Sequence, residues 1–232
     1  MEFIPILVSR FLFKKTVLML FSRTKKFDFQ PEIVLNDRLL DVVENCKLLG
    51  VILSSNLKWK KNVDHIKAKA MSKLWTLRRI KEVGGSTHDL LDVYILQIRC
   101  LCELACPVWN GSITKKDIKE LESIQKTALR VILESKYESY KDALKYFDLS
   151  SLEDRRKMLS LKFAKKLEKS EKFKVWFKKA PKSNRYSRKY VKRNKYSRKY
   201  VIPKTRTAAY FKSPIIYLTK LLNDDYLMKS NK

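Results

Sequence analysis

The sequence predicts an α+β protein that is mostly α-helical and has three parts. Short β-strands are expected over residues 1–55, an antiparallel helical bundle over 56–170, and a basic, partly disordered tail with a short C-terminal helix over 171–232. Three observations predict this division. The apolar period changes from two to about 3.6 near residue 60, cap and stop residues punctuate the chain after that point, and acidic residues are absent from 172 to 212.

The strands are predicted from short apolar runs separated by residues typical of turns. The pairs Asn36-Asp37 and Glu44-Asn45 mark two of these turns. The apolar runs between them cover 16–21, 33–35, 39–43 and 47–53. No further strands follow, so we expect these to be part of an incomplete sheet.

The first helix is predicted from apolar residues spaced by three and four positions from residue 62 onward. The residues on this face are Val63, Ile66, Ala70, Leu74, Leu77 and Ile80. Gly84-Gly85 provides a stop signal, and Ser86 with Asp89 provides an N-cap for the next helix. That second helix is expected to run to Pro107.

Three further helices complete the predicted bundle. Thr114 with Asp117 caps a helix that extends to about residue 132, and a short helix is expected over 138–146. Ser151 opens a helix that continues to about residue 170. Because the connections are short, neighbouring helices are expected to pack antiparallel.

The tail is distinguished by charge and by a repeat. Between Lys172 and Lys212 it has 16 Lys and Arg residues and no acidic residue, and the eight residues at 184–191 recur with small changes at 194–201. Such a segment repels itself and has little apolar surface to bury. We therefore expect it to be disordered when unbound, apart from a helical start near Trp176.

The charge of the whole chain indicates a polyanionic partner, and nucleic acid is the commonest one. The formal net charge is +28. Residues 1–149 contain 26 Lys and Arg against 18 Asp and Glu, whereas residues 150–232 contain 26 against 6. The tail is the strongest candidate for this contact. The alternative is that it is a solvated linker or a nuclear-import signal.

Several other function classes are disfavoured by what the sequence lacks. Its four glycines do not form a phosphate-binding loop, and no Ser-His-Asp, Cys-His or metal-spaced carboxylate set supports a hydrolase. Cys100, Cys102 and Cys106 cluster without a nearby histidine, which favours buried reduced thiols over a zinc site. The apolar stretch at 3–13 is too short and too poorly flanked for a membrane span or a leader, so we expect an intracellular protein, nuclear or cytoplasmic, that is not secreted.

An ordered series of short motifs resembles one enzyme family. The run Lys47-Leu-Leu-Gly-Val-Ile-Leu53, followed by Asn56-Leu-Lys-Trp59, is similar to the segment after the palm in non-LTR retrotransposon reverse transcriptases. The later motifs resemble the thumb and downstream region of the same enzymes; they are Leu74-Trp-Thr-Leu-Arg-Arg79, Leu91-Asp-Val-Tyr94, Pro107-Val-Trp-Asn110, Ile124-Gln-Lys126, Leu129, Tyr137-Glu-Ser-Tyr140, Ala143-Leu144, Leu152 and Arg155-Arg156. The resemblance covers about residues 14–178.

This resemblance implies a nucleic-acid-binding part of an RNA-directed DNA polymerase from a transposable element. The family binds Mg²⁺ through palm carboxylates in an aromatic-x-Asp-Asp motif. Glu153-Asp154 and Asp224-Asp225 do not match that motif. We therefore expect no catalytic residue, metal ligand or cofactor in this chain, with the fingers and most of the palm upstream of residue 1.

The candidate nucleic-acid contacts are cations and neighbouring aromatic residues, since lysine and arginine neutralise phosphate and aromatic rings stack on bases. In the first two parts they are Lys58, Trp59, Lys60, Lys61, Arg78, Arg79, Lys81, Lys126, Arg130, Arg155 and Arg156. In the tail they are Arg185, Tyr186, Arg188, Lys189, Tyr190, Arg193, Tyr196, Arg198, Lys199 and Tyr200. For Trp59 the alternative is packing between the strands and the first helix.

Two hypotheses follow for the function. The first is a truncated reverse-transcriptase-derived protein that binds RNA or DNA with little sequence specificity, is inactive alone and has a possible partner in an upstream polymerase fragment. The second is an independent basic RNA- or DNA-binding module kept by a host. An intact small enzyme is disfavoured because the carboxylates of the family motif are missing.

Overall fold

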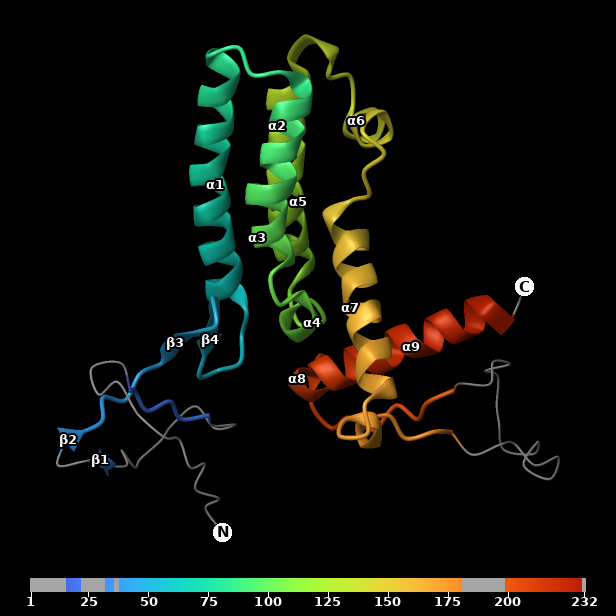
Figure 1. The fold of residues 1–232 in the computed structure, drawn as a ribbon. Coiled ribbons are helices and arrows are strands. Elements are labelled where there is room, and N and C mark those ends of the chain that lie inside the picture. The colour runs from blue at the N-terminus through green and yellow to red at the C-terminus, as the bar shows by residue number, and fades with distance from the viewer. Residues whose placement is uncertain (1–15, 22–31, 36–37, 181–198, 231–232) are drawn as a thin grey trace. The chain divides into compact units, whose positions relative to one another are not determined.

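The computed structural model describes residues 16–21, 32–35, 38–180 and 199–230. The described part is mostly helical, with short antiparallel strands on its N-terminal side, which confirms the predicted fold class (Figure 1). The chain divides into two compact units, residues 1–62 and 63–232. The boundary lies just after the start of the first helix, seven residues later than the expected limit of the strand region at residue 55.

The N-terminal unit contains two small antiparallel pairs. Strand β1 (Val34–Leu35) pairs with β2 (Arg38–Leu39), and β3 (Asn45–Leu48) pairs with β4 (Val51–Ser54). The expected single strand over 47–53 is therefore wrong, because Leu49 and Gly50 form a tight turn between β3 and β4. Both residues have positive φ, 48° and 86°, as a two-residue hairpin turn requires.

The first helix of the bundle, α1 (Lys60–Glu82), ends where the glycine pair predicts. Gly84 has a φ of +89°, and the amide of Gly85 donates to the Ile80 carbonyl. Helix α2 (Thr87–Val93) then begins with a capping box, in which Ser86 and Asp89 bond each other's backbone amides.

The second expected helix is interrupted. Helix α2 continues through a π-helical turn (Tyr94–Arg99) into α3 (Cys100–Glu103), and the helix then ends before α4 (Cys106–Trp109) begins. Ala105, in the left-handed conformation with a φ of 50°, makes this break. Pro107 was expected to stop the helix, but it lies in the first turn of α4, where a missing amide costs nothing.

The remaining helices of the bundle match the predicted ones. Helix α5 (Lys115–Leu133) starts with a capping box from Thr114 and Asp117, and α6 (Tyr140–Tyr146) and α7 (Leu152–Lys169) are capped by serines. The long helices alternate in direction and lie side by side (Figure 1). Their buried side chains form the core of this unit; the largest include Trp109, Tyr94, Leu74, Leu77, Leu121, Leu129 and Leu152.

The described parts of residues 171–232 pack onto α7. A 3-10 turn (Lys174–Trp176) follows α7, a short bridge pairs Lys179 with Tyr200, and α8 (Ala208–Phe211) leads into α9 (Pro214–Ser230). Helix α9 crosses α7 (Figure 1), and a small apolar cluster lies between them, which we call the α7–α9 cluster; it contains Ala164, Leu167, Phe177, Tyr200, Leu218 and Leu222. The expected short C-terminal helix is 17 residues long.

No helix within the described ranges has the length and apolar character needed to cross a lipid bilayer.

Candidate nucleic-acid interface

Helix α7 has a buried, largely apolar face and an exposed basic face. The buried face follows helical spacing through Leu152, Ala164 and Leu167. The opposite face exposes Lys162, Lys166 and Lys169, with Phe163 beside them. Because residues three and four apart share a helix face, these three lysines form one stripe, which we call the α7 stripe.

The segment after α7 adds an exposed aromatic pair. The Lys174 amide donates to the Ser170 carbonyl, and the Trp176 amide donates to the Phe173 carbonyl. This turn brings the rings of Phe173 and Trp176 together, with centroids 4.9 Å apart and planes inclined by 58°. Phe177 points into the core, whereas Trp176 remains 45% exposed.

Two more lysines follow this pair in the sequence, at a point where the backbone is held by hydrogen bonds. The Ala180 amide donates to the Lys199 carbonyl, and the Val201 amide donates to the Lys178 carbonyl. Lys178 and Lys179 are exposed on this bridge. These hydrogen bonds hold Ala180 and Lys199 next to each other; residues 181–198 between them lie outside the described ranges.

The carboxylates at the C-terminal end of α7 already pair with lysines. Glu171 pairs with Lys174, and Glu168 accepts hydrogen bonds from Lys199 and from the Tyr200 hydroxyl. Burial alone would raise the pKa of Glu168, but these hydrogen bonds outweigh it and hold the pKa below its usual value. Glu168 is therefore ionised and neutralised locally at pH 7.

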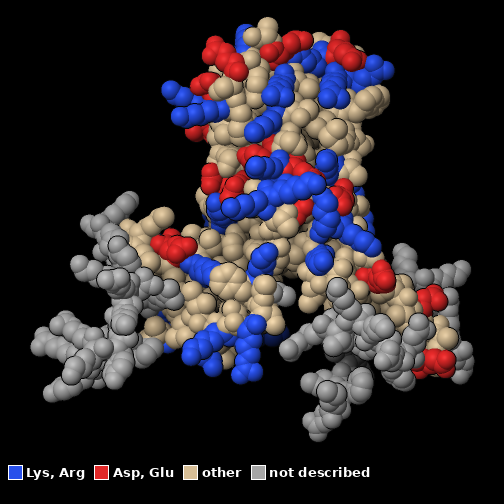
Figure 2. Space-filling view, turned by 180° about the vertical axis from the view of Figure 1, so that it is seen from behind, with Lys and Arg blue, Asp and Glu red and all other residues tan. Residues whose placement is uncertain are grey.

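The lysines of the α7 stripe and of the bridge have no such partner. Among the described residues, Lys162, Lys166, Lys169, Lys178 and Lys179 form no ion pair. Figure 2 shows Lys and Arg side chains spread over the visible face of the helical unit, including its lower end. We call the following set the basic end: Lys162, Phe163, Lys166, Lys169, Lys172, Trp176, Lys178 and Lys179.

Most predicted contacts around α1 are on the surface, but two are not available. Lys58, Lys60, Lys61, Arg78 and Arg79 are exposed. Trp59 is only 9% exposed, which agrees with the packing alternative for its ring, so Trp59 is not available to stack on a base. Lys81 is engaged within the fold, where its Nζ donates to the Val131 carbonyl at 2.5 Å and pairs with Glu134 at 2.9 Å.

Several predicted arginines and lysines have intramolecular partners that stabilise the bundle. Arg79 pairs with Glu82 at 2.7 Å and lies over the Trp75 ring. Lys126 lies over Tyr140 and Arg130 over Tyr137, with 5.0 and 5.3 Å to the ring centroids. These contacts leave the arginine and lysine charges partly exposed but restrict their positions.

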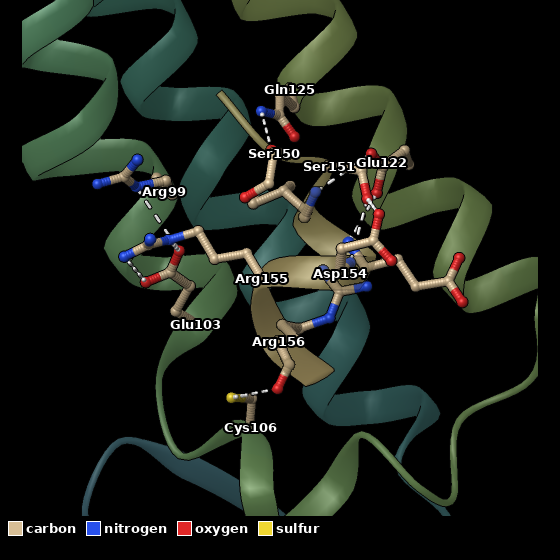
Figure 3. Close-up of polar contacts among 12 residues, drawn as sticks. Arg99, Glu103, Cys106, Glu122, Gln125, Ser150, Ser151, Asp154, Arg155 and Arg156 are labelled. Carbon is tan, nitrogen blue, oxygen red and sulfur yellow. Dashed lines mark hydrogen bonds and ion pairs between the residues drawn. The ribbon is translucent and has the colours of Figure 1, made fainter. Parts of the chain in front are cut away.

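Adjacent arginines at the start of α7 point in different directions (Figure 3). Arg155 reaches Glu103, which also pairs with Arg99 at 3.6 Å. Arg156 enters the core, where its Nε donates to Asn110 Oδ1 at 2.9 Å. Because Arg156 is fully buried, its predicted contact with nucleic acid is wrong.

Arg156 belongs to a buried polar cluster in the core that also contains the thiols of Cys102 and Cys106. Burial lowers the pKa of Arg156, and burial raises the pKa of the Cys102 thiol to about 12. Cys106 is also buried, and its thiol faces the Arg156 carbonyl at 3.8 Å (Figure 3). At neutral pH these thiols are protonated, and buried thiols of this kind are poor nucleophiles.

The predicted tail residues fall into two groups. Lys199 pairs with Glu168, and Tyr200 is buried with its backbone amide and carbonyl both bonded to Asn223. The expected stacking and mobility of Tyr200 are therefore wrong, because its ring packs against Phe177. The other predicted residues lie outside the described ranges: Arg185, Tyr186, Arg188, Lys189, Tyr190, Arg193, Tyr196 and Arg198.

The residues of the basic end were not among the nucleic-acid contacts predicted from the sequence. The α7 stripe was detectable, since Lys162, Lys166 and Lys169 recur at spacings of four and three on the side opposite Leu152 and Ala164. The exposure of Trp176 beside the buried Phe177 was not detectable, because adjacent aromatic residues in a turn give no periodicity.

The described ranges contain no cluster of three or more His, Cys, Asp or Glu side chains that could hold a metal ion. Comparison of the chain with protein-family models, with curated proteins and with solved structures finds no match.

Proposed function

We propose that this chain is an intracellular nucleic-acid-binding protein that holds RNA or DNA at its basic end, with little sequence preference. The observation that carries the proposal is the set of exposed lysines without ion-pair partners among the described residues, beside an exposed tryptophan. Lysines that neutralise phosphates release condensed counterions, which drives binding regardless of sequence.

The position of these lysines supports the proposal further. The α7 stripe and the bridge lysines belong to elements fixed by the α7–α9 cluster, so their charges are held together without a large loss of backbone entropy on binding.

We further propose, from the ordered motifs described above, that the chain derives from the reverse transcriptase of a non-LTR retrotransposon. On this proposal its role is to bind nucleic acid, and Mg²⁺ belongs to a palm that carries the aromatic-x-Asp-Asp motif. Genomic sequence upstream of codon 1 tests the origin. A reading frame with that motif supports it, and several hundred codons without any palm-like sequence contradict it.

The binding proposal is tested by removing two charges from α7 and comparing with two from α1. The variant Lys162→Gln/Lys166→Gln removes an exposed pair spaced by four residues, and Lys69→Gln/Lys73→Gln removes an equivalent exposed pair from the middle of α1. Affinity for a fluorescent oligonucleotide is measured by anisotropy over a range of salt concentrations.

The expected result is a smaller salt dependence for the α7 variant alone. Each lost phosphate contact lowers the slope of log K against log salt by about 0.7 on a single strand, so two lost contacts lower it by about 1.4. Equal slopes for the α7 variant, the α1 variant and the wild type would contradict binding at the basic end.

A further inference from the structure

We propose that Trp176 is a base-stacking residue and that the basic end therefore selects single-stranded over double-stranded nucleic acid. This inference rests on the proposed function and names the form of nucleic acid that the site takes. It is carried by the exposure of Trp176, by its support from Phe173, and by the lysines on both sides of it.

Trp176 differs from the other three tryptophans in its surroundings. Trp59 and Trp109 are in the core, with 9% and 0% of their surface exposed. Trp75 is 59% exposed, but Arg79 lies over its ring, with the guanidinium carbon 5.3 Å from the centroid, and Arg79 is itself paired with Glu82. Trp176 is 45% exposed, and its ring contact within the described residues is Phe173.

Phe173 holds the indole of Trp176 in a defined place. The Phe173 ring is half-buried against the α7–α9 cluster, and Lys172 Nζ lies 5.6 Å from its centroid. The turn from Ser170 to Phe177 is closed by backbone hydrogen bonds. The indole thus has a tilted ring contact with Phe173 before any ligand arrives, which reduces the entropy lost on binding.

The charges around Trp176 complement a phosphate backbone. Lys172, Lys178 and Lys179 are within four residues of it, and Lys169 ends the α7 stripe just before it. Glu171, the nearest acidic residue in sequence, pairs with Lys174. An aromatic ring bordered by cations is the arrangement by which sequence-tolerant single-strand binders combine stacking with counterion release.

This arrangement favours a single strand because of where the faces of the bases lie. In a duplex each base is already stacked between its neighbours, and a protein must unstack it before a tryptophan can contact its face. In a single strand that face is available at little cost. Lysines attract both forms, so the tryptophan is the group that discriminates between them.

The test uses the full chain, with oligo(U) and oligo(dT) as single strands and a duplex of equal length. Trp176→Ala removes the ring, Trp176→Phe retains an aromatic face, and Trp75→Ala is the matched control, because it removes the other exposed tryptophan. Circular dichroism and thermal melting of each variant confirm that the bundle is intact. Affinities are measured by anisotropy at several salt concentrations.

We expect Trp176→Ala to weaken single-strand binding about 5- to 150-fold. The salt slope should stay unchanged, since no charge is removed. Trp176→Phe should retain most of the affinity, Trp75→Ala should bind like the wild type, and duplex binding should be unaffected by all three. Oligo(U) should also quench less tryptophan fluorescence in Trp176→Phe than in the wild type.

The failures of the two proposals are distinguishable. If Trp176→Ala binds single strands as tightly as the wild type, or loses duplex affinity equally, stacking at Trp176 is refuted while nucleic-acid binding stands. If the wild type binds neither form at low salt, the proposed function is refuted, and the stacking role with it.

Discussion

Replacing Arg156 by methionine should stabilise the helical unit, although arginine here has a hydrogen bond. The Arg156 side chain is fully buried, and its Nη1 and Nη2 have no hydrogen-bond partner among the described residues. Its Nε donates to Asn110, and its guanidinium lies 5.9 Å from the centroid of the Trp109 ring. Methionine keeps the aliphatic stem and removes the buried charge.

The magnitude follows from the groups that change. Each buried donor without a partner destabilises the folded state by about 1–3 kcal/mol, whereas the charged hydrogen bond to Asn110 stabilises it by about 1.5–3 kcal/mol. Replacing buried charged groups by apolar side chains of similar volume is often neutral or stabilising by about 1–4 kcal/mol. We therefore expect the Arg156→Met variant to raise the free energy of unfolding by about 1–3 kcal/mol.

The assay is urea denaturation followed by circular dichroism, with Arg155→Met as the control. Arg155 donates hydrogen bonds to Glu103, and both side chains are mostly buried, so the loss of Arg155 should cost about 1.5–3 kcal/mol. Adjacent residues on one helix should thus give changes of opposite sign. A loss of more than about 1 kcal/mol for Arg156→Met would refute the reasoning, because it would mean that Nη1 and Nη2 are satisfied in solution.

Three further predictions concern the framework of the helical unit. Thr114→Ala should lower the free energy of unfolding by about 1 kcal/mol in urea denaturation, because it removes the capping box of α5; no change would mean that the cap contributes nothing. Gly111→Ala should cost about 1–3 kcal/mol in the same assay, because a Cβ would lie 2.5 Å from Cγ of Tyr217 on α9, and an unaffected midpoint would contradict this packing. The hydrogen bond from Lys165 lowers the pKa of Asp225. The ionised carboxylate therefore stabilises the fold at pH values above the pKa of an unfolded aspartate, about 3.9, and this contribution is lost as the pH falls through the folded-state pKa. Asp225→Asn should therefore lower Tm at pH 7, with a difference from the wild type that shrinks below about pH 4, and a constant difference would show that the pair is not the cause.

The sequence alone determined the fold class and most helix boundaries, because these depend on local chemistry. Ser86 and Thr114 cap their helices as predicted, and Gly84 ends α1, since each acts through its own backbone and that of its near neighbours. The break before α4 was placed wrongly because Pro107 is equally compatible with the end of a helix and with its first turn. The turn at Leu49 and Gly50 was missed because a leucine seldom adopts positive φ.

The tertiary structure decided which charged and aromatic side chains reach solvent. Arg155 and Arg156 are adjacent residues of the same type, yet one pairs with Glu103 of α3 and the other is in the core, because Arg156 shares the buried face of α7 with Leu152 and packs against α4. Likewise Phe177 is buried because it packs in the α7–α9 cluster, whereas Trp176 lies outside this cluster and is exposed. For Trp176 and Phe177, burial is set by contacts with segments far apart in the chain, and no local periodicity encodes those contacts.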